Sequence, residues 1–233
     1  SKAAVNMGVK QTGAGSSYVN LAWDAQLGAG HYHTQFSQDG KNWIDMDNSS
    51  SPSESVYNLT QGASYYARVV AYKGSHYTGT HVMIGVSETA IVSTKPTEVS
   101  GLTQTAAGVN SISMSWNASA GAASYVIYGY INYNWTQIGT SATNSATITG
   151  VAATTSTRFS VAAVKNVTGG TVTGDQCSGV EMKAIPIKVS RIAMRYYWDS
   201  LKEAKYIWTD VNNADGYQYE VKSANGKKTY FRA

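Results

Sequence analysis

The sequence predicts an all-β protein built from tandem antiparallel β-sandwiches, two of them complete and one partial. The main reason is a spacing that occurs three times, a Trp and a Tyr separated by eight residues. The three pairs are Trp23 and Tyr32, Trp116 and Tyr125, and Trp208 and Tyr217. The tryptophans lie 93 and 92 residues apart. A fixed internal period of this kind indicates repeated structural units.

Each Trp ends a short run in which apolar residues alternate with mainly small or polar ones. Successive side chains of a strand point to opposite faces, so each run places three mostly apolar groups on one face. This pattern is typical of a half-buried antiparallel strand. The three sets are Val19, Leu21 and Trp23; Ile112, Met114 and Trp116; and Ala204, Tyr206 and Trp208.

Each Tyr opens a second alternating strand, which ends in a turn sequence. The turns contain Asp39-Gly40, Asn132-Tyr133-Asn134 and Asn225-Gly226. Asp-Gly and Asn-Gly favour hairpins because both central residues of a type I′ turn need positive φ. Alternating segments at 65–71 and 157–163 add a later strand to the first two units. Short strands separated by turn signals predict β-sandwiches.

These residues resemble the fibronectin type III repeat, an immunoglobulin-like β-sandwich. In that family a core Trp ends strand B, a Tyr opens strand C, and a Leu-x-Pro-Gly-x-x-Tyr stretch leads into strand F. Residues 59–65 are similar to that stretch, with Gln61 in place of Pro. The resemblance implies that the Tyr65 hydroxyl bonds back to nearby backbone. Thr157 takes the Tyr position in the second repeat, so we expect that corner to be less firmly braced.

The resemblance covers essentially the whole chain and divides it into repeats at 1–95 and 96–185 and a partial repeat at 186–233. Lys95-Pro96 and Ile185-Pro186 fall at corresponding points. Proline suits a joint because it lacks a backbone donor and disfavours helix in the residue before it. The linkers are only a few residues long, so we expect elongated end-to-end packing with limited bending.

The third unit is expected to lack strands E, F and G. Half a sandwich leaves an apolar face and open strand edges uncovered. One interpretation is that the polypeptide is a fragment of a longer tandem array. The other is that a second chain completes the unit, which would make self-association through this repeat possible.

Charge is distributed unevenly along the chain. Residues 1–95 carry six basic and six acidic side chains, residues 96–185 carry three of each, and residues 186–233 carry nine and five. Two neutral repeats give no electrostatic footprint for nucleic acid, so no nucleic-acid partner is expected. The lysines of the third segment are expected to lie on a solvated strand face, where they discourage edge-to-edge pairing.

The single cysteine excludes an intrachain disulfide, and the hydropathy pattern argues against a membrane span. Cys177 cannot form an intrachain disulfide and is expected to be a small buried residue, because no His accompanies it in sequence. No 18-residue apolar run occurs, so no membrane span is expected.

No catalytic set, metal site or cofactor is expected. His31 and His33 share a face of a predicted strand and could ligate a metal, but no Cys or carboxylate stands at ligand spacing. We expect these and the other two histidines to be exposed strand and loop residues. Asp45 and Asp47 lie in a polar stretch without an aromatic subsite, so a paired-carboxylate hydrolase is not expected.

The candidate contact residues are mainly aromatic. Tyr128, Tyr130, Tyr133 and Trp135 cluster in the predicted C-strand hairpin of the second repeat. Tyr128 and Tyr130 should point outward, where aromatic rings can stack on sugars or anchor a partner protein. The alternative is packing across the outer sheet face or against a neighbouring repeat.

A second candidate is the F–G loop of the first repeat, which contains His76 and Tyr77. Loops on a rigid sandwich commonly carry recognition, and these residue types suit contact surfaces.

The resulting hypothesis is a non-catalytic spacer or adhesion module, secreted or on the cell surface, within a larger bacterial protein. This location follows from the resemblance, since the Ala-, Gly-, Ser-, Thr- and Asn-rich repeats look like bacterial extracellular ones. The expected partner is a protein or glycan ligand. The alternative is an accessory carbohydrate-binding segment of a secreted glycan-degrading enzyme.

Overall fold

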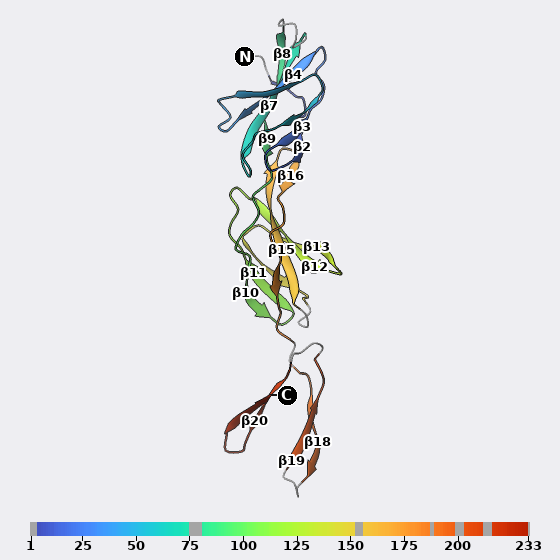
Figure 1. Cartoon of the computed structure of the whole chain (residues 1–233), viewed down its shortest axis with the longest axis vertical. Coiled ribbons are helices and arrows are strands. Elements are labelled where there is room, and N and C mark those ends of the chain that lie inside the picture. Colours follow the sequence, from blue (N-terminus) through green and yellow to red (C-terminus); the bar gives the residue numbers. More distant parts are fainter. Residues whose placement is uncertain are drawn as a thin grey trace.

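The computed structural model describes residues 4–74, 81–151, 156–186, 189–198, 203–211 and 216–232. Every regular element in these ranges is a β-strand, and the units follow one another along one long axis (Figure 1). The predicted fold class is confirmed: the chain contains tandem antiparallel sandwiches of the immunoglobulin-like type. Among the described residues no helix is long and apolar enough to cross a membrane.

The first unit consists of two sheets. One sheet contains β1 (Ala4–Val5), β4 (His31–Ser37), β5 (Ile44–Ser49), β7 (Ser64–Lys73), β8 (Val82–Ser87) and β9 (Ala90–Ser93), and the other contains β2 (Lys10–Ala14), β3 (Val19–Ala22) and β6 (Ser53–Val56). The long β7 pairs with β4 on one edge, and with β8 and then β9 on the other. β7 therefore corresponds to strand F, and β8 and β9 are two halves of an interrupted strand G.

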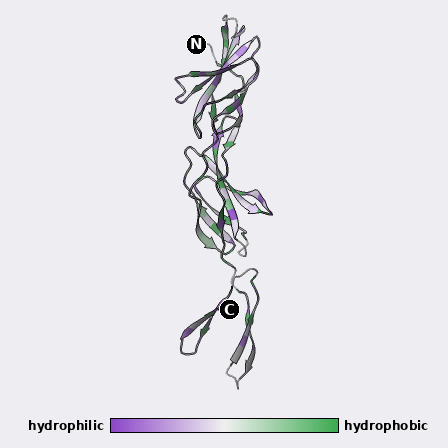
Figure 2. Ribbon diagram, in the orientation of Figure 1, coloured by the Kyte–Doolittle hydropathy of each residue, from purple (hydrophilic) through white to green (hydrophobic). Residues whose placement is uncertain are grey.

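The second unit repeats this arrangement. One sheet contains β10 (Thr103–Gly108), β11 (Ser111–Ser115) and β14 (Ser145–Thr149), and the other contains β12 (Ser124–Ile131), β13 (Asn134–Ser141), β15 (Thr157–Val167), β16 (Gly170–Thr173) and β17 (Val180–Met182). In each of these two units the inward faces of the two sheets form one buried core, as the alternation predicts. Figure 2 shows hydrophobic and hydrophilic residues interspersed along their strands. Cys177 lies in the second core, as expected.

The repeated Trp–Tyr pair makes the same local contacts in all three units. The two rings meet with centroids 5.4, 5.3 and 5.5 Å apart in units one, two and three. Each Tyr hydroxyl also accepts a hydrogen bond from the backbone N–H six residues before it. The donors are Gln26 at 3.0 Å, Ser119 at 3.0 Å and Val211 at 2.7 Å. The motif therefore fixes the loop between strands B and C.

The tyrosine corner of the first repeat is present. The Tyr65 hydroxyl accepts a hydrogen bond from the Thr60 N–H at 3.1 Å, which confirms the contact implied by the resemblance. Gly62, in the same turn, has φ +70°, a conformation that favours glycine.

The third unit contains two separate hairpins. β18 (Ile192–Trp198) pairs with β19 (Glu203–Trp208), and β20 (Gln218–Lys222) pairs with β21 (Lys228–Arg232). Figure 1 shows the two ribbons diverging from the end of the second unit. Within the described residues, neither ribbon has a third strand.

Candidate interaction surfaces

The aromatic residues of the second repeat lie on the β12–β13 hairpin, which projects from the side of the molecule (Figure 1). Asn132 and Tyr133 form its turn with φ of 49° and 64°, the positive values that a type I′ turn requires. The Tyr133 side chain is 90% exposed at the tip. An Asn at the first of these positions tolerates the left-handed conformation, whereas a Tyr at the second is uncommon there.

The hairpin brings Tyr130 and Trp135 together. They are directly opposed across the two strands, and their rings meet edge to face with centroids 5.3 Å apart. Tyr128 is half-buried on the same outer face, while Ile127 is buried in the core, so the predicted facing is as observed.

A glycine makes room for the Trp135 ring. A Cβ placed on Gly179 would lie 2.8 Å from Trp135 Cη2, which is closer than real Cβ contacts. The same Cβ position is 3.4 Å from Arg158 Nε, so one edge of the indole lies beside β15 and the start of β17. Trp135 is nevertheless 36% exposed, and it forms a partly supported aromatic surface with Tyr130.

The second candidate, the F–G loop with His76 and Tyr77, lies outside the described residues. In the described part of the first unit, the rings of His31, His33 and His81 each contact Tyr72. The His31 ring stacks on Tyr72 with centroids 5.1 Å apart, and it lies 5.4 Å from each of the other two imidazoles.

The expectation that His31 is exposed was wrong. It is buried on the outer face of the sheet, where its Nδ1 lies 3.0 Å from the Gly74 carbonyl oxygen. Alternation along β4 correctly excludes it from the core, but the end of β7 covers that part of the outer face. No group of three or more His, Cys, Asp or Glu in the described ranges is placed to hold a metal ion.

The same outer face carries a cation–π pair that the sequence did not indicate. The Arg68 guanidinium lies 4.0 Å from the centre of the Trp43 ring, and its Nε donates to Gln35 Oε1 at 2.8 Å. Burial lowers the pKa of Arg68, and the charge of Asp45 opposes this effect. No short sequence pattern connects Trp43, just before β5, with Arg68 on β7, because they lie 25 positions apart in sequence.

Several polar contacts join the first two units. The β15–β16 hairpin of the second unit reaches back along the first and lies against β9. The Thr168 N–H donates to the Ile91 carbonyl at 2.8 Å, and the Ile91 N–H donates to Thr168 Oγ1 at 2.7 Å. The turn residue Gly169 has φ +84°, which permits this tight hairpin. The hairpin tip thus pairs with the outer edge of β9.

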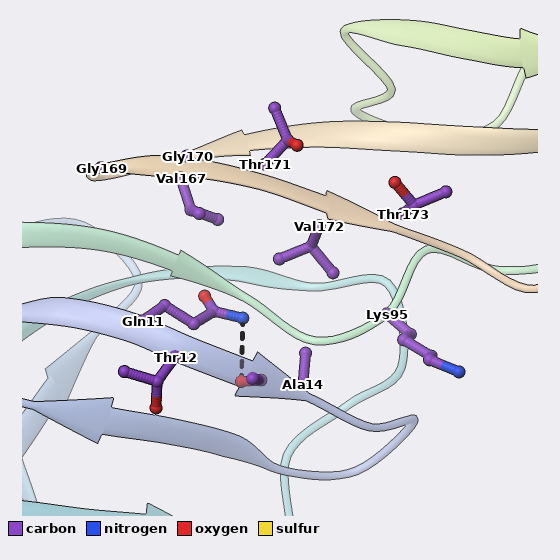
Figure 3. Close-up of a pocket in the computed structure, with 11 residues that line it drawn as sticks. Gln11, Thr12, Ala14, Lys95, Val167, Gly169, Gly170, Thr171, Val172 and Thr173 are labelled. Carbon is purple, nitrogen blue, oxygen red and sulfur yellow. Dashed lines mark hydrogen bonds between the residues drawn. The ribbon is translucent and has the colours of Figure 1, made fainter.

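Lys165, on the same hairpin, is buried at this joint. Its ammonium group donates to the Gly62 carbonyl and to Ser64 Oγ, the latter at 3.5 Å, and burial lowers the pKa of the amine. An exposed ion pair between Lys95 and Asp175, at 2.6 Å, lies nearby. Beside these contacts a cleft of about 370 Å³ separates β2 from β16 (Figure 3).

Sequence reasoning missed this joint. One signal was available: β15 is 11 residues long, and its last residues extend beyond the core pairs with β12. The extension packs on residues more than 70 positions away in sequence, so the sequence around β15 does not show which surface it contacts.

Comparison with known proteins identifies similar solved structures but no sequence relatives. No protein-family model matches the sequence, and no curated protein matches it significantly. A two-domain fibronectin type III segment of chicken tenascin is 17% identical, with a TM-score of 0.38, and the match covers 76% of this chain and 97% of that one.

The fibronectin type III domains 1–3 of chicken CNTN1 are 14% identical, with a TM-score of 0.45, and the match covers 78% of this chain and 67% of that one. The fold assignment rests on the strand topology described above.

Proposed function

We propose that this chain is a non-catalytic spacer, whose first two units form one stiff rod that holds neighbouring parts of a larger protein apart. The observation that carries the proposal is the overlap between the units. A linker of a few residues limits bending but does not by itself fix the angle between the two sandwiches. Here the β15–β16 hairpin adds contacts to the Gly62–Ser64 segment and to β9 that the linker alone does not provide.

The joint restricts bending because its hydrogen bonds are directional and come from separate points. The exchanged pair between Thr168 and Ile91 fixes the hairpin tip, and Lys165 fixes its base to the Gly62–Ser64 segment. A net hydrogen bond contributes about 1 kcal/mol, and leaving a buried ammonium unpaired costs several times that amount. The exposed Lys95–Asp175 pair adds little.

Spin-label distance measurements test this proposal. Labels at Asn48→Cys and Gln137→Cys, both exposed on different units, should give one narrow distance distribution. Combining Thr168→Val with Lys165→Met should broaden the distribution, because both changes keep side-chain bulk and remove hydrogen bonds across the joint. Thr149→Val, exposed on β14 away from the joint, is the control and should leave the width unchanged. A broad distribution in the unsubstituted protein would contradict the proposal.

We further propose that the rod is secreted or displayed at a cell surface. The support is the resemblance to bacterial extracellular repeats, and the test is protease accessibility on intact cells compared with lysed cells.

The β12–β13 hairpin supports a second function, binding of a glycan or a protein. The favouring observation is Tyr133 at the tip together with the Tyr130–Trp135 pair, since exposed aromatic rings can stack on the apolar faces of sugars. A glycan array comparing the protein with Tyr133→Ala and Tyr130→Ala separates the ligand classes. Tyr57→Ala, exposed on the first unit, is the matched control. If the protein bound no glycan, the proposed ligand of the β12–β13 hairpin would be a protein.

A further inference from the structure

The β12–β13 hairpin has one open strand edge. The sheet order of the second unit is β13, β12, β15 and β16, so β13 is paired on one side only among the described residues. Its first four residues, Asn134–Gln137, are all exposed. β15 pairs with β12 only as far as Gly129, and the hairpin beyond that residue projects from the sheet (Figure 1). This half of β13 is therefore accessible to a further strand.

The backbone groups on this edge come from Trp135 and Gln137. When a two-residue turn joins two antiparallel strands, the residues that flank the turn, here Ile131 and Asn134, exchange hydrogen bonds. Bonded and non-bonded pairs alternate along the strands, so the N–H and C=O groups of Trp135 and Gln137 point away from β12. No backbone hydrogen bond joins them to another segment of the described chain. An edge of this kind is complementary to an extended polypeptide backbone.

The matching strand of the first unit shows how such an edge is protected. β5 is also an edge strand, and its pairing with β4 has the same irregularity as the pairing of β13 with β12. Counted from that irregularity, Asp45 of β5 matches Gln137 of β13, and Asp47 matches Gly139. Charged side chains on an edge oppose the addition of a further strand. β13 carries no charged residue, so it lacks this protection.

The side chains beside the open edge differ between its two faces. Residues directly opposed across two strands share a face, so a residue added opposite Trp135 lies on the face that carries the Trp135–Tyr130 pair. Trp135 is 36% exposed, so part of its indole is available for contact. On the other face the neighbours are the polar residues Asn134 and Thr136. The edge therefore suits an uncharged strand in which apolar and polar side chains alternate.

We propose that the open edge of β13 binds an extended, uncharged segment of a partner protein, which joins the sheet as a further strand. The segment exchanges backbone hydrogen bonds with Trp135 and Gln137, and its alternate side chains pack on the Trp135–Tyr130 surface. This inference rests on the proposed ligand-binding role of the β12–β13 hairpin. It names the ligand as a polypeptide that is recognised through its backbone.

Peptide selection on the whole chain tests the proposal. The probe is the most enriched octapeptide from a random displayed library, which is then synthesised and titrated into the protein. Gln137→Pro removes an outward N–H and should weaken binding by about tenfold, because proline is tolerated where the N–H of an edge strand faces solvent. Gln137→Ala keeps that N–H and should bind as the parent does. Equal affinity of the two variants, or enrichment of no peptide, would overturn the proposal.

Methylation of the peptide backbone is a test that leaves the protein unchanged. In an added strand, alternate N–H groups of the peptide face β13, and the others face solvent. N-methylation of the first set should abolish binding, and N-methylation of the second set should leave it unchanged. A peptide that tolerated methylation at every position would be bound through its side chains alone, which would contradict strand addition.

The ring variants separate this inference from the proposed role of the hairpin. If Tyr130→Ala and Tyr133→Ala reduced peptide binding but Gln137→Pro did not, the hairpin would bind through its rings, and strand addition would be wrong. If none of the three variants changed binding, the hairpin would not be the site, and both proposals would fail.

Sedimentation equilibrium of the free protein tests whether the occupant is a second copy of this chain. We expect a monomer. A dimer that Gln137→Pro dissociated would show that β13 pairs with itself, and it would overturn the assignment to another protein.

Discussion

Replacing Tyr125 by Phe separates the two roles of the Trp–Tyr motif. The Tyr125 ring packs edge to face on Trp116, and its hydroxyl accepts the Ser119 N–H at 3.0 Å. Phe keeps the ring and its contact but removes the acceptor. The Ser119 amide then has to find water or remain unsatisfied.

The structure sets the magnitude of this loss. Tyr125 is buried, but Ser119 is only half-buried, so water can partly replace the lost acceptor. We therefore expect a loss of about 1–2 kcal/mol in the free energy of unfolding of the second unit. For a domain of this size that corresponds to a decrease in Tm of about 4–8 °C for each kcal/mol.

Hydrogen exchange in urea, read by mass spectrometry peptide by peptide, is the suitable assay because it reports on each unit separately. Peptides from β11, β12 and β15 should lose protection, while those from the first unit should not. Tyr133→Phe is the control, since that hydroxyl is already in solvent, and it should change stability by less than about 0.5 kcal/mol. If Tyr125→Phe were indistinguishable from Tyr133→Phe, the hydroxyl would not brace the loop.

Three further outcomes follow from single contacts. Glu88→Gln should destabilise the first unit by about 1.5–3 kcal/mol in denaturant unfolding, because the Glu88 carboxylate accepts the N–H groups of Met7 and Val9, each at 2.9 Å. Burial raises the pKa of Glu88, but these backbone donors outweigh burial and leave the pKa below its usual value. This stabilisation is therefore present at neutral pH and is lost as the pH falls through the folded-state pKa. If the stability of the Gln variant fell as steeply in acid as that of the parent, this reasoning would be contradicted. Gly179→Ala should displace the Trp135 ring and increase acrylamide quenching of its fluorescence, with Gly170→Ala, where a Cβ meets no atom within 4 Å, as the control. Lys165→Met alone should increase protease cleavage in the 94–102 segment between β9 and β10 without lowering hydrogen-exchange protection of the second core. Loss of core protection would mean that Lys165 acts within its own unit instead.

Features set by neighbouring residues were predictable from the sequence. The period of the Trp–Tyr pairs, the hairpin turns and the Tyr65 corner all depend on residues within ten positions of one another, where residue type restricts conformation directly. Alternation also placed Tyr130 on the outer face of its strand.

Features that depend on distant segments were not predictable. Lys165 lies 103 residues from Gly62, and nothing in its own strand indicates that its amine is buried at a joint. His31 occupies an outward position, yet the end of β7 covers it. Alternation tells which side of a sheet a residue occupies, but whether that side meets solvent depends on the rest of the chain.

The third unit shows which part of the motif is local. Trp208 and Tyr217 meet at 5.5 Å, and the Tyr217 hydroxyl accepts the Val211 N–H at 2.7 Å, although the face around them is open. The ring contact and the loop bond therefore do not need a closed core, because nine residues of chain bring both partners together. In the first two units the same pair is also buried. The pair therefore holds the loop in all three units, but it belongs to a core only where strands E and F cover it. The Trp–Tyr spacing thus marks the start of a sandwich, and its burial marks the completion of one.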